Sequence, residues 1–236
     1  VVILGAGGMG KTALADQVLH RLDGIVSASF IHGSPVLSRM PYGVLSPYLD
    51  AADPADMESP LTVLRTIRRY FHRVSEQGSP QPLLVVDDAH WLDEASCHVL
   101  TQLAMSGELR LLVLSRNRAP RIQELLSLAR DGLLARVDLG ALPPDAVHDV
   151  CAGLLGGPVL RASSALLATA SGGNPLYLRA LLARTRRLGQ LVEGNGAWFL
   201  RREPDGLDAA VVDLVKGQLG SRTPEERETL ETLALA

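Results

Sequence analysis

Short apolar runs alternate with amphipathic segments through the first part of the chain. Runs rich in Val, Ile and Leu predict buried β-strands, and they lie at residues 1–4, 25–31, 83–86, 109–114 and 135–139. Segments whose apolar residues recur at helical spacing separate these strands, at residues 13–22, 61–74, 93–106 and 121–130. Strands and helices in alternation favour a parallel sheet with helices on both faces. We therefore predict an α/β domain with a parallel five-stranded sheet.

Prolines and glycines interrupt this alternation between residues 32 and 60. Seven of them fall there, which predicts a loop, with one short helix near residues 44–49. In the helix expected over residues 61–74, we predict an apolar stripe made of Leu61, Leu64, Ile67, Tyr70, Phe71 and Val74. The same helix carries four arginines, which are more typical of a solvated face than of a binding patch: Arg65, Arg68, Arg69 and Arg73.

The pattern changes after Pro143-Pro144, where helical stripes dominate. They lie at residues 146–155, 160–170, 176–188, 209–219 and 224–235. Gly194-Asn195-Gly196 stands between two short apolar runs and predicts a β-hairpin. We expect a domain boundary near residue 142, a small helical domain over residues 143–220 and the start of a further domain at residues 221–236.

Composition and charge narrow the class of protein. The chain has 236 residues, is 47% hydrophobic and has a formal net charge of -3, as expected for a globular protein without a large nucleic-acid-binding surface. Cys97 and Cys151 lie far apart and form no metal-ligand motif, so we expect both to be packed in the protein and the compartment to be reducing and cytoplasmic. No apolar run is long enough for a membrane span. The sequence opens on a strand without Met, so we expect a piece of a longer protein.

The loop after the first strand carries the clearest chemical motif. Gly5-Ala6-Gly7-Gly8-Met9-Gly10-Lys11-Thr12 matches the phosphate-binding pattern G-x-x-x-x-G-K-[ST]. Its glycines let the backbone turn N–H groups around an anion, and the helix N-terminus that follows also favours phosphate. Lys11 is expected to reach the β- and γ-phosphates, and Thr12 to ligate Mg²⁺. The motif predicts a nucleotide-binding site.

Two carboxylates follow the apolar run at residues 83–86. A phosphate-binding loop needs an acid at the end of a neighbouring strand to hold Mg²⁺, and Asp87 is in the right position for this role. Asp88 is the candidate for orienting the attacking water or accepting its proton. The alternative is that both are solvated acids at the start of a loop. Together with the phosphate-binding motif, the functional interpretation is favoured.

Several residues near these motifs have two interpretations. His90 next to Trp91 is more typical of a structural pair, and its functional alternative is coupling the γ-phosphate site to a neighbouring domain. Asp93 is expected to cap the next helix. Arg116 and Arg118 follow the strand at residues 109–114, at the edge of the sheet where ligands bind. Either arginine can contact a γ-phosphate, with Arg116 preferred, or lie on the surface.

Four motifs together resemble the STAND class of nucleotide-switch ATPases, and in particular the ATPase region of large LuxR-family (MalT-like) bacterial transcriptional regulators. They are the phosphate-binding loop, the run Leu83–Asp93, the strand end at Leu111–Arg118 and the segment Gly172-Gly173-Asn174-Pro175-Leu176-Tyr177-Leu178. The resemblance implies a P-loop NTPase of AAA+/STAND type, with a helical lid and the start of a winged helix at residues 221–236. It also implies that Pro175 lies against adenine.

The resemblance also implies a function. ATP, ADP and Mg²⁺ would be the ligands, and slow ATP hydrolysis would reset an active form that associates with itself in response to an inducer. DNA would be bound only by a domain outside this chain. Three alternatives stay open: a constitutive P-loop ATPase or kinase, a GTPase, and a scaffold that keeps ADP as a structural ligand. The GTPase lacks support because no N-K-x-D guanine motif follows Leu114.

Overall fold

A computed structural model describes residues 1–49, 59–76, 81–107, 109–117 and 120–204. The chain divides into two compact units, one from Val1 to Gly140 and one that begins at Ala141. The sequence-based boundary near residue 142 is two residues from this division. Each unit is described by itself.

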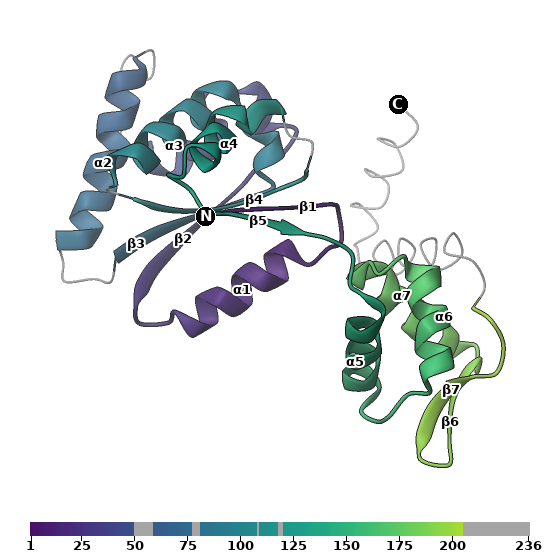
Figure 1. The fold of residues 1–236 in the computed structure, drawn as a ribbon. Helices are drawn as coiled ribbons and strands as arrows, with labels where there is room; N and C mark the ends of the chain where they lie inside the picture. The colour runs from purple at the N-terminus through teal and green to yellow at the C-terminus, as the bar shows by residue number, and fades with distance from the viewer. Residues whose placement is uncertain (50–58, 77–80, 108, 118–119, 205–236) are drawn as a thin grey trace, which may run out of the picture. The chain divides into compact units, whose positions relative to one another are not determined.

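The first unit is built on a parallel sheet with the strand order β2-β3-β4-β1-β5. Its strands are β1 (Val2–Gly5), β2 (Val26–His32), β3 (Gln81–Asp87), β4 (Arg110–Ser115) and β5 (Arg136–Leu139). All neighbouring pairs are parallel. The prediction of a parallel five-stranded sheet is confirmed, and the order inserts β4 between β1 and β3 (Figure 1).

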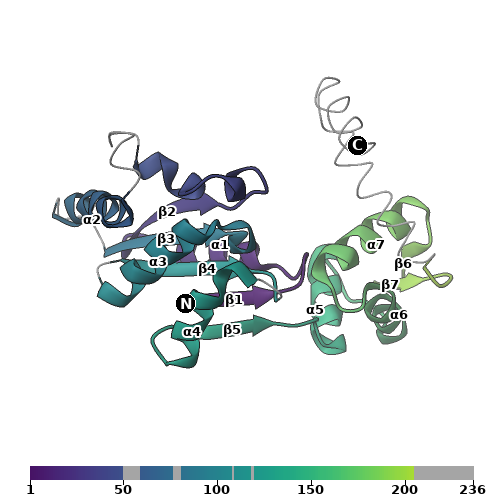
Figure 2. The same cartoon turned by 90° about the horizontal axis from the view of Figure 1, so that it is seen from above.

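Helices cover both faces of this sheet (Figures 1 and 2). On one face lies α1 (Lys11–Arg21), and on the other lie α2 (Pro60–Glu76), α3 (Glu94–Ser106) and α4 (Gln123–Arg130). Side chains alternate between the two faces along each strand, as the pleat requires. Leu84 and Val86 of β3 belong to the larger core cluster, whereas Leu83 and Val85 belong to the cluster with Ala15 of α1.

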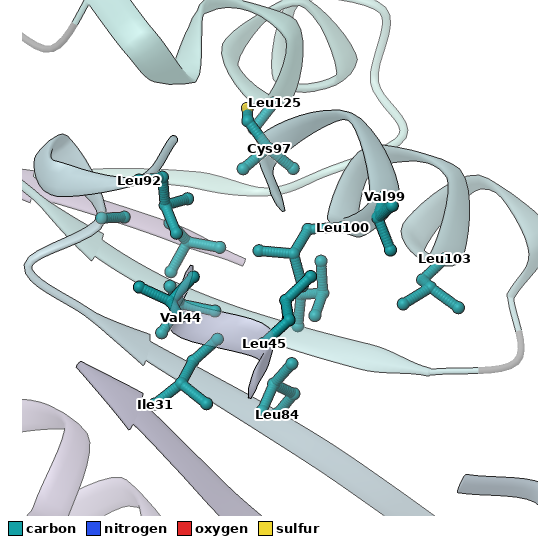
Figure 3. Packing of buried hydrophobic residues seen from close by; sticks show 14 of the residues in the cluster. Ile31, Val44, Leu45, Leu84, Leu92, Cys97, Val99, Leu100, Leu103 and Leu125 are labelled. Carbon is teal, nitrogen blue, oxygen red and sulfur yellow. The ribbon is translucent and has the colours of Figure 1, made fainter. Parts of the chain in front are cut away.

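The larger core lies between the sheet and α2–α4. Figure 3 shows Leu84 of β3 and Ile31 of β2 packed beneath Leu100 and its neighbours on α3. Val99, Leu100 and Leu103 of α3 are fully buried or nearly so, as the helical stripe predicts. Continuous apolar runs in β3 and β4 follow from burial on both faces.

The ends of α3 agree with the sequence. Asp93 is its N-cap, and its Oδ1 accepts a hydrogen bond from the backbone N–H of Ser96 at 2.8 Å. The same oxygen accepts the N–H of Tyr42 at 3.0 Å, so the cap also holds the preceding loop. Gly107 ends the helix with φ 71°, a left-handed conformation that glycine adopts without strain.

In the described part of the loop at residues 32–60, the structure contains two 3₁₀ helices where one short helix was expected. They are η1 (Leu37–Arg39) and η2 (Gly43–Tyr48). A proline inside η2 removes one backbone donor, and Tyr42 before it has a left-handed φ of 57°, so a regular α-helix does not form.

The apolar stripe predicted over residues 61–74 was assigned partly to the wrong face, and α1 also exposes apolar residues. In α2, Leu61 and Tyr70 are exposed, and Val63 is buried in their place. In α1, Leu14 and Val18 are exposed, and Ala15 contacts the sheet. Both helices carry more apolar residues than one face can bury, so spacing alone does not choose among them. The four arginines of α2 are exposed, as expected.

Over residues 141–204, the second unit packs three helices and a hairpin around its own core. These are α5 (Pro144–Leu155), α6 (Arg161–Ser171), α7 (Pro175–Arg187), β6 (Leu191–Gly194) and β7 (Ala197–Leu200). The hairpin turns at Asn195 and Gly196, both with positive φ, which is the geometry the Asn-Gly pair predicts. The helices and the winged-helix start predicted within residues 205–236 lie outside the described residues.

Both cysteines are buried and free, as predicted, and burial raises the pKa of each thiol to about 11. In the part of the chain that the structure describes, every helix is too short or too polar to cross a membrane.

Leu100→Ala should lower the free energy of unfolding by about 2–5 kcal/mol, because Leu100 is completely buried and its removal leaves a cavity under α3. Urea titration measures this change. Met105→Ala on the same helix is the matched control, since Met105 is 58% exposed, and it should change stability by less than about 0.5 kcal/mol. Equal losses in the two variants would contradict this description of the core.

Candidate nucleotide-binding site

The loop between β1 and α1 forms an open backbone turn at the carboxyl edge of the sheet. Gly8 and Gly10 have φ values of 79° and 84°, which L side chains adopt only with strain. Gly10 is the N-cap of α1 and has no side chain that could cap the helix. The first turn of α1 contains no acidic residue. The N-terminal end of α1 therefore keeps the positive potential that attracts phosphate.

Lys11 lies at the start of α1 with its ammonium turned back over this loop. Its Nζ donates hydrogen bonds to the carbonyl oxygens of Gly5 and Ala6, at 2.9 and 3.0 Å. Burial lowers the pKa of Lys11, and the nearby charge of Arg116 acts in the same direction, while Asp88 and Asp87 oppose it. The loop holds a cation among its own carbonyl groups, and incoming phosphate oxygens can replace those carbonyls.

Thr12 and Asp87 meet across the sheet edge. The Thr12 Oγ1 donates a hydrogen bond to Asp87 Oδ2 at 2.9 Å, although 75 residues separate them. The strand register explains the contact, since Leu4 pairs with Ser115 and Val86 pairs with Val113, so β1, β4 and β3 all end at the same edge of the sheet. The two residues predicted to hold Mg²⁺ are thus brought together.

Asp88 has a different environment from Asp87. Its backbone is left-handed, with φ 48° and ψ 41°, and its N–H donates to Asp87 Oδ1 at 2.8 Å. The Asp87 side chain is 12% exposed, whereas the Asp88 side chain is 56% exposed. One carboxylate is held within the protein and the other faces solvent, as a metal ligand and a water-orienting group would require.

Gly33 is a positioning residue that the sequence did not single out. It follows β2, and its N–H donates to the carbonyl of Asp87 at 2.9 Å. A Cβ on Gly33 would clash with the backbone carbonyl of Asp88. The close approach of these two backbones supports the strained turn at Asp88. A glycine after a strand is typical of an ordinary loop, so the sequence did not indicate the contact between Gly33 and Asp88.

The end of β4 adds further polar groups beside the loop. Ser115 is fully buried, and its hydroxyl has no hydrogen-bond partner among the described residues. Arg116 is exposed, and its charge acts on both Lys11 and His90. Arg118 lies outside the described residues. The predicted contact of Arg116 with a γ-phosphate stays a prediction.

The second unit contains the remaining predicted contact, Pro175. It is the first residue of α7, and Asn174 caps this helix by accepting the N–H of Leu176 at 3.0 Å. The carbonyl of Gly173, in turn, accepts the N–H of Leu142 at 2.8 Å. These bonds fix the segment locally. The predicted contact of Pro175 with adenine stays a prediction.

The side chains at this edge suit Mg²⁺. Thr12 and Asp87 provide hard oxygen donors next to each other, and Mg²⁺ commonly takes one or two protein ligands together with substrate phosphates and water. Within the described residues there is no group of three or more His, Cys, Asp and Glu side chains that could hold a metal by themselves. A magnesium ion here would therefore be bound together with the nucleotide.

A cavity of about 490 Å³ lies elsewhere in the first unit. It is lined by residues of η1, the segment before η2, the N-terminal part of α3 and the first residues of α2 and α4, among them Arg39, Met40, Tyr42, His98 and Glu124. None of the predicted site residues lines it.

The first unit has the α/β fold of P-loop NTPases, with a parallel five-stranded sheet. Residues 1–114 match the family described as AAA ATPase domain. The Orc1 protein of Aeropyrum pernix, solved in complex with DNA, aligns with a TM-score of 0.57 and 17% identity, over 100% of this chain and 65% of that chain. Cdc6p of Pyrobaculum aerophilum aligns with a TM-score of 0.56 and 15% identity, over 80% of this chain and 56% of that chain.

A Signal Transduction ATPase with Numerous Domains (STAND) protein of Pyrococcus horikoshii, which has a tetratricopeptide repeat sensor, is also similar. It aligns with a TM-score of 0.53 and 17% identity, over 100% of this chain and 32% of that chain. These likenesses show the fold, and the chain spans between 32% and 65% of the three solved chains. No curated protein matches the sequence.

Gly33→Ala should lower the free energy of unfolding by about 1–3 kcal/mol, because the added methyl group displaces the Asp88 carbonyl. Gly140→Ala is the control, since a Cβ there meets nothing within 4 Å and its φ is not left-handed. Urea unfolding of both variants provides the measurement. A Gly33→Ala protein as stable as the control would show that the two backbones are not packed as described.

Proposed function

We propose that this chain is a nucleotide-operated switch that binds ATP or ADP with Mg²⁺ and hydrolyses ATP slowly. The observation that supports it most is the hydrogen bond from Thr12 to Asp87, at 2.9 Å, beside a lysine held inside the glycine loop. A strand-end acid, a hydroxyl and an ammonium at one helix N-terminus are the groups that a triphosphate and its metal need.

Each side chain has a distinct part in this proposal. Lys11 exchanges the carbonyls of Gly5 and Ala6 for β- and γ-phosphate oxygens. Thr12 and Asp87 hold Mg²⁺, which neutralises charge that develops on the phosphates. Asp88 orients the attacking water, and Arg116 contacts the γ-phosphate by charge-assisted hydrogen bonds. The remaining loop residues, Gly5 to Gly10, surround the phosphates with backbone N–H groups.

The switch depends on contacts that the protein can make with ATP and cannot make with ADP. A γ-phosphate adds bonds to Lys11, Arg116 and the metal that ADP cannot make, so ATP favours any conformation in which all of them are satisfied. Hydrolysis removes those bonds and returns the protein to the ADP form. We propose that ATP-bound chains associate with one another and that an inducer promotes exchange of ADP for ATP.

We further propose that the switch belongs to a transcriptional regulator of the LuxR (MalT-like) kind. The support is the combination of the phosphate loop, the run Leu83–Asp93, the strand end at Leu111–Arg118 and the segment Gly172–Leu178. DNA binding would then lie in a domain outside this chain. The flanking sequence tests this directly: a helix-turn-helix domain agrees with the proposal, and a peptidase or kinase domain contradicts it.

A constitutive P-loop ATPase or kinase is the alternative function. Such an enzyme turns over rapidly without an inducer, whereas a switch keeps its nucleotide bound. Release of nucleotide from the purified protein and its steady-state rate therefore distinguish the two. Retention of ADP with turnover well below about 1 s⁻¹ favours the switch, because typical enzymes reach 1–10³ s⁻¹.

Lys11→Ala should weaken ADP and ATP binding by about 100-fold or more, because the loop loses its charged hydrogen-bond donor to the phosphates. Isothermal calorimetry gives the affinities. The chain's only other lysine, Lys216, lies in no predicted nucleotide motif, so Lys216→Ala is the matched control and should bind normally. Unchanged ADP affinity in Lys11→Ala refutes the assignment of the loop.

Asp88→Asn should keep nucleotide affinity within about threefold and lower ATP turnover by about 100-fold, because the amide cannot accept the water's proton. Asp131→Asn, at the exposed C-cap of α4, should behave as the parent. Phosphate release under single-turnover conditions separates chemistry from product release. If Asp88→Asn hydrolyses ATP at the parent rate, Asp88 does not orient the water.

A further inference from the structure

His90 is a buried histidine whose ring nitrogens have no hydrogen-bond partner among the described residues. It lies in the 3₁₀ helix η4 (Ala89–Trp91), directly after the strained turn at Asp88. Only 9% of its side-chain surface is exposed, and its Nδ1 is 3.7 Å from Asp88 Oδ1. Burying two unpaired polar atoms is costly, and a purely apolar side chain would fill the same space without that cost.

The charged groups around His90 are those of the candidate site. Burial lowers the pKa of His90 most strongly, the charges of Arg116 and Lys11 act in the same direction, and Asp88 and Asp87 act against them. A neutral imidazole carries one N–H donor and one acceptor. The nitrogen that faces Asp88 can therefore donate to its carboxylate.

The local backbone keeps the His90 ring close to the Asp88 carboxylate, so only a small movement is needed to form a hydrogen bond between them. The N–H of Trp91 donates to the Asp88 carbonyl at 2.9 Å and closes the turn that carries His90. The Trp91 ring packs against the imidazole with centroids 5.2 Å apart. A shortening of the 3.7 Å separation by about 1 Å reaches hydrogen-bond distance, and such contacts are often long without substrate and tighten when it binds.

We propose that His90 is a positioning residue for ATP hydrolysis: its Nδ1–H donates to the Asp88 carboxylate and orients it toward the attacking water. This inference rests on the proposed function. In the step itself, the water oxygen forms a bond to the γ-phosphorus while the bond from that phosphorus to the bridging oxygen breaks. The water's proton passes to Asp88, and ADP and phosphate leave. His90 holds the base and does not receive the proton.

In this arrangement, His90 would hold the Asp88 carboxylate in one orientation. Asp88 is the exposed member of the pair and can reach water, whereas His90 is the buried member behind it. A base held by a second group loses less orientational freedom in the transition state than a free surface carboxylate. The left-handed backbone at Asp88 is consistent with a position fixed for this purpose.

The test compares His90→Phe with His90→Asn. Phe keeps a ring of similar size without nitrogen, whereas the Asn amide carries an N–H near the position of Nδ1. His90→Phe should lower the single-turnover rate by about 10-fold or more with unchanged ATP affinity, and His90→Asn should recover most of the rate. His98→Phe is the matched control, because His98 is 53% exposed on α3 and pairs with Glu124 at 3.4 Å.

A double variant separates positioning from packing. If His90 acts through Asp88, then Asp88→Asn with His90→Phe should be no slower than Asp88→Asn alone. Additive losses overturn the proposal, as does a His90→Phe protein with the parent rate. A fall in ATP affinity parallel to the fall in rate also overturns it, since it would show a structural or binding role.

Nitrogen NMR gives a readout that does not depend on the rate of ATP hydrolysis. With ADP and magnesium bound, His90 should show a protonated Nδ1, and Asp88→Asn should shift that signal. The signal of His90 among the six histidines is the one lost in His90→Asn. A protonated Nε2 with bare Nδ1 would overturn the proposal.

Different results would overturn the proposed function and the role of His90. A parent protein that neither binds nor hydrolyses ATP overturns the proposed function and this inference with it. A parent that hydrolyses ATP while His90→Phe matches it overturns only the role of His90.

Discussion

The contact between Thr12 and Asp87 is the interaction on which the rest of the site depends. It joins the start of α1 to the end of β3 across 75 residues of sequence. In the sheet, β4 lies between β3 and β1, the strand that leads into α1. Only a parallel register that aligns the carboxyl ends of β1, β4 and β3 brings them within 2.9 Å. The burial of the apolar strands on both faces maintains this register, because a slip by one residue would turn each side chain to the opposite face. Core packing therefore sets the geometry of the polar edge.

Backbone strain at the end of β3 is the second constraint. Asp88 has a left-handed conformation that is uncommon for a residue with a side chain, and three hydrogen bonds hold the neighbouring backbone. Asp88 N–H donates to Asp87, Trp91 N–H donates to Asp88, and Gly33 N–H donates to Asp87. Because Gly33 has no Cβ, β2 can approach this turn closely. Contacts from two neighbouring segments thus offset the strain. The left-handed turn directs the side chains of Asp87 and Asp88 differently.

Much of the first unit could be predicted from the sequence. The five strands and the cap at Asp93 depend on local patterns, as does the hairpin turn at Asn195 in the second unit, and the structure confirms them. The phosphate loop was recognisable because its residues are contiguous. The parts that were missed depend on packing between distant segments. Spacing did not distinguish Val63 from Leu61, and nothing in the sequence linked Gly33 to Asp88.

The division of roles between two adjacent aspartates shows why residue type alone does not define chemistry. Asp87 and Asp88 have the same carboxyl group, and the sequence could only order them by distance from the strand. In the structure, Asp87 is bonded to a hydroxyl and to a backbone N–H, so its oxygens are oriented and its charge is partly compensated. Asp88 faces solvent on one side and a buried imidazole on the other. A carboxylate with fixed oxygens suits a metal, and one that borders both solvent and an imidazole suits proton transfer. The turn between them, more than either side chain, creates that difference.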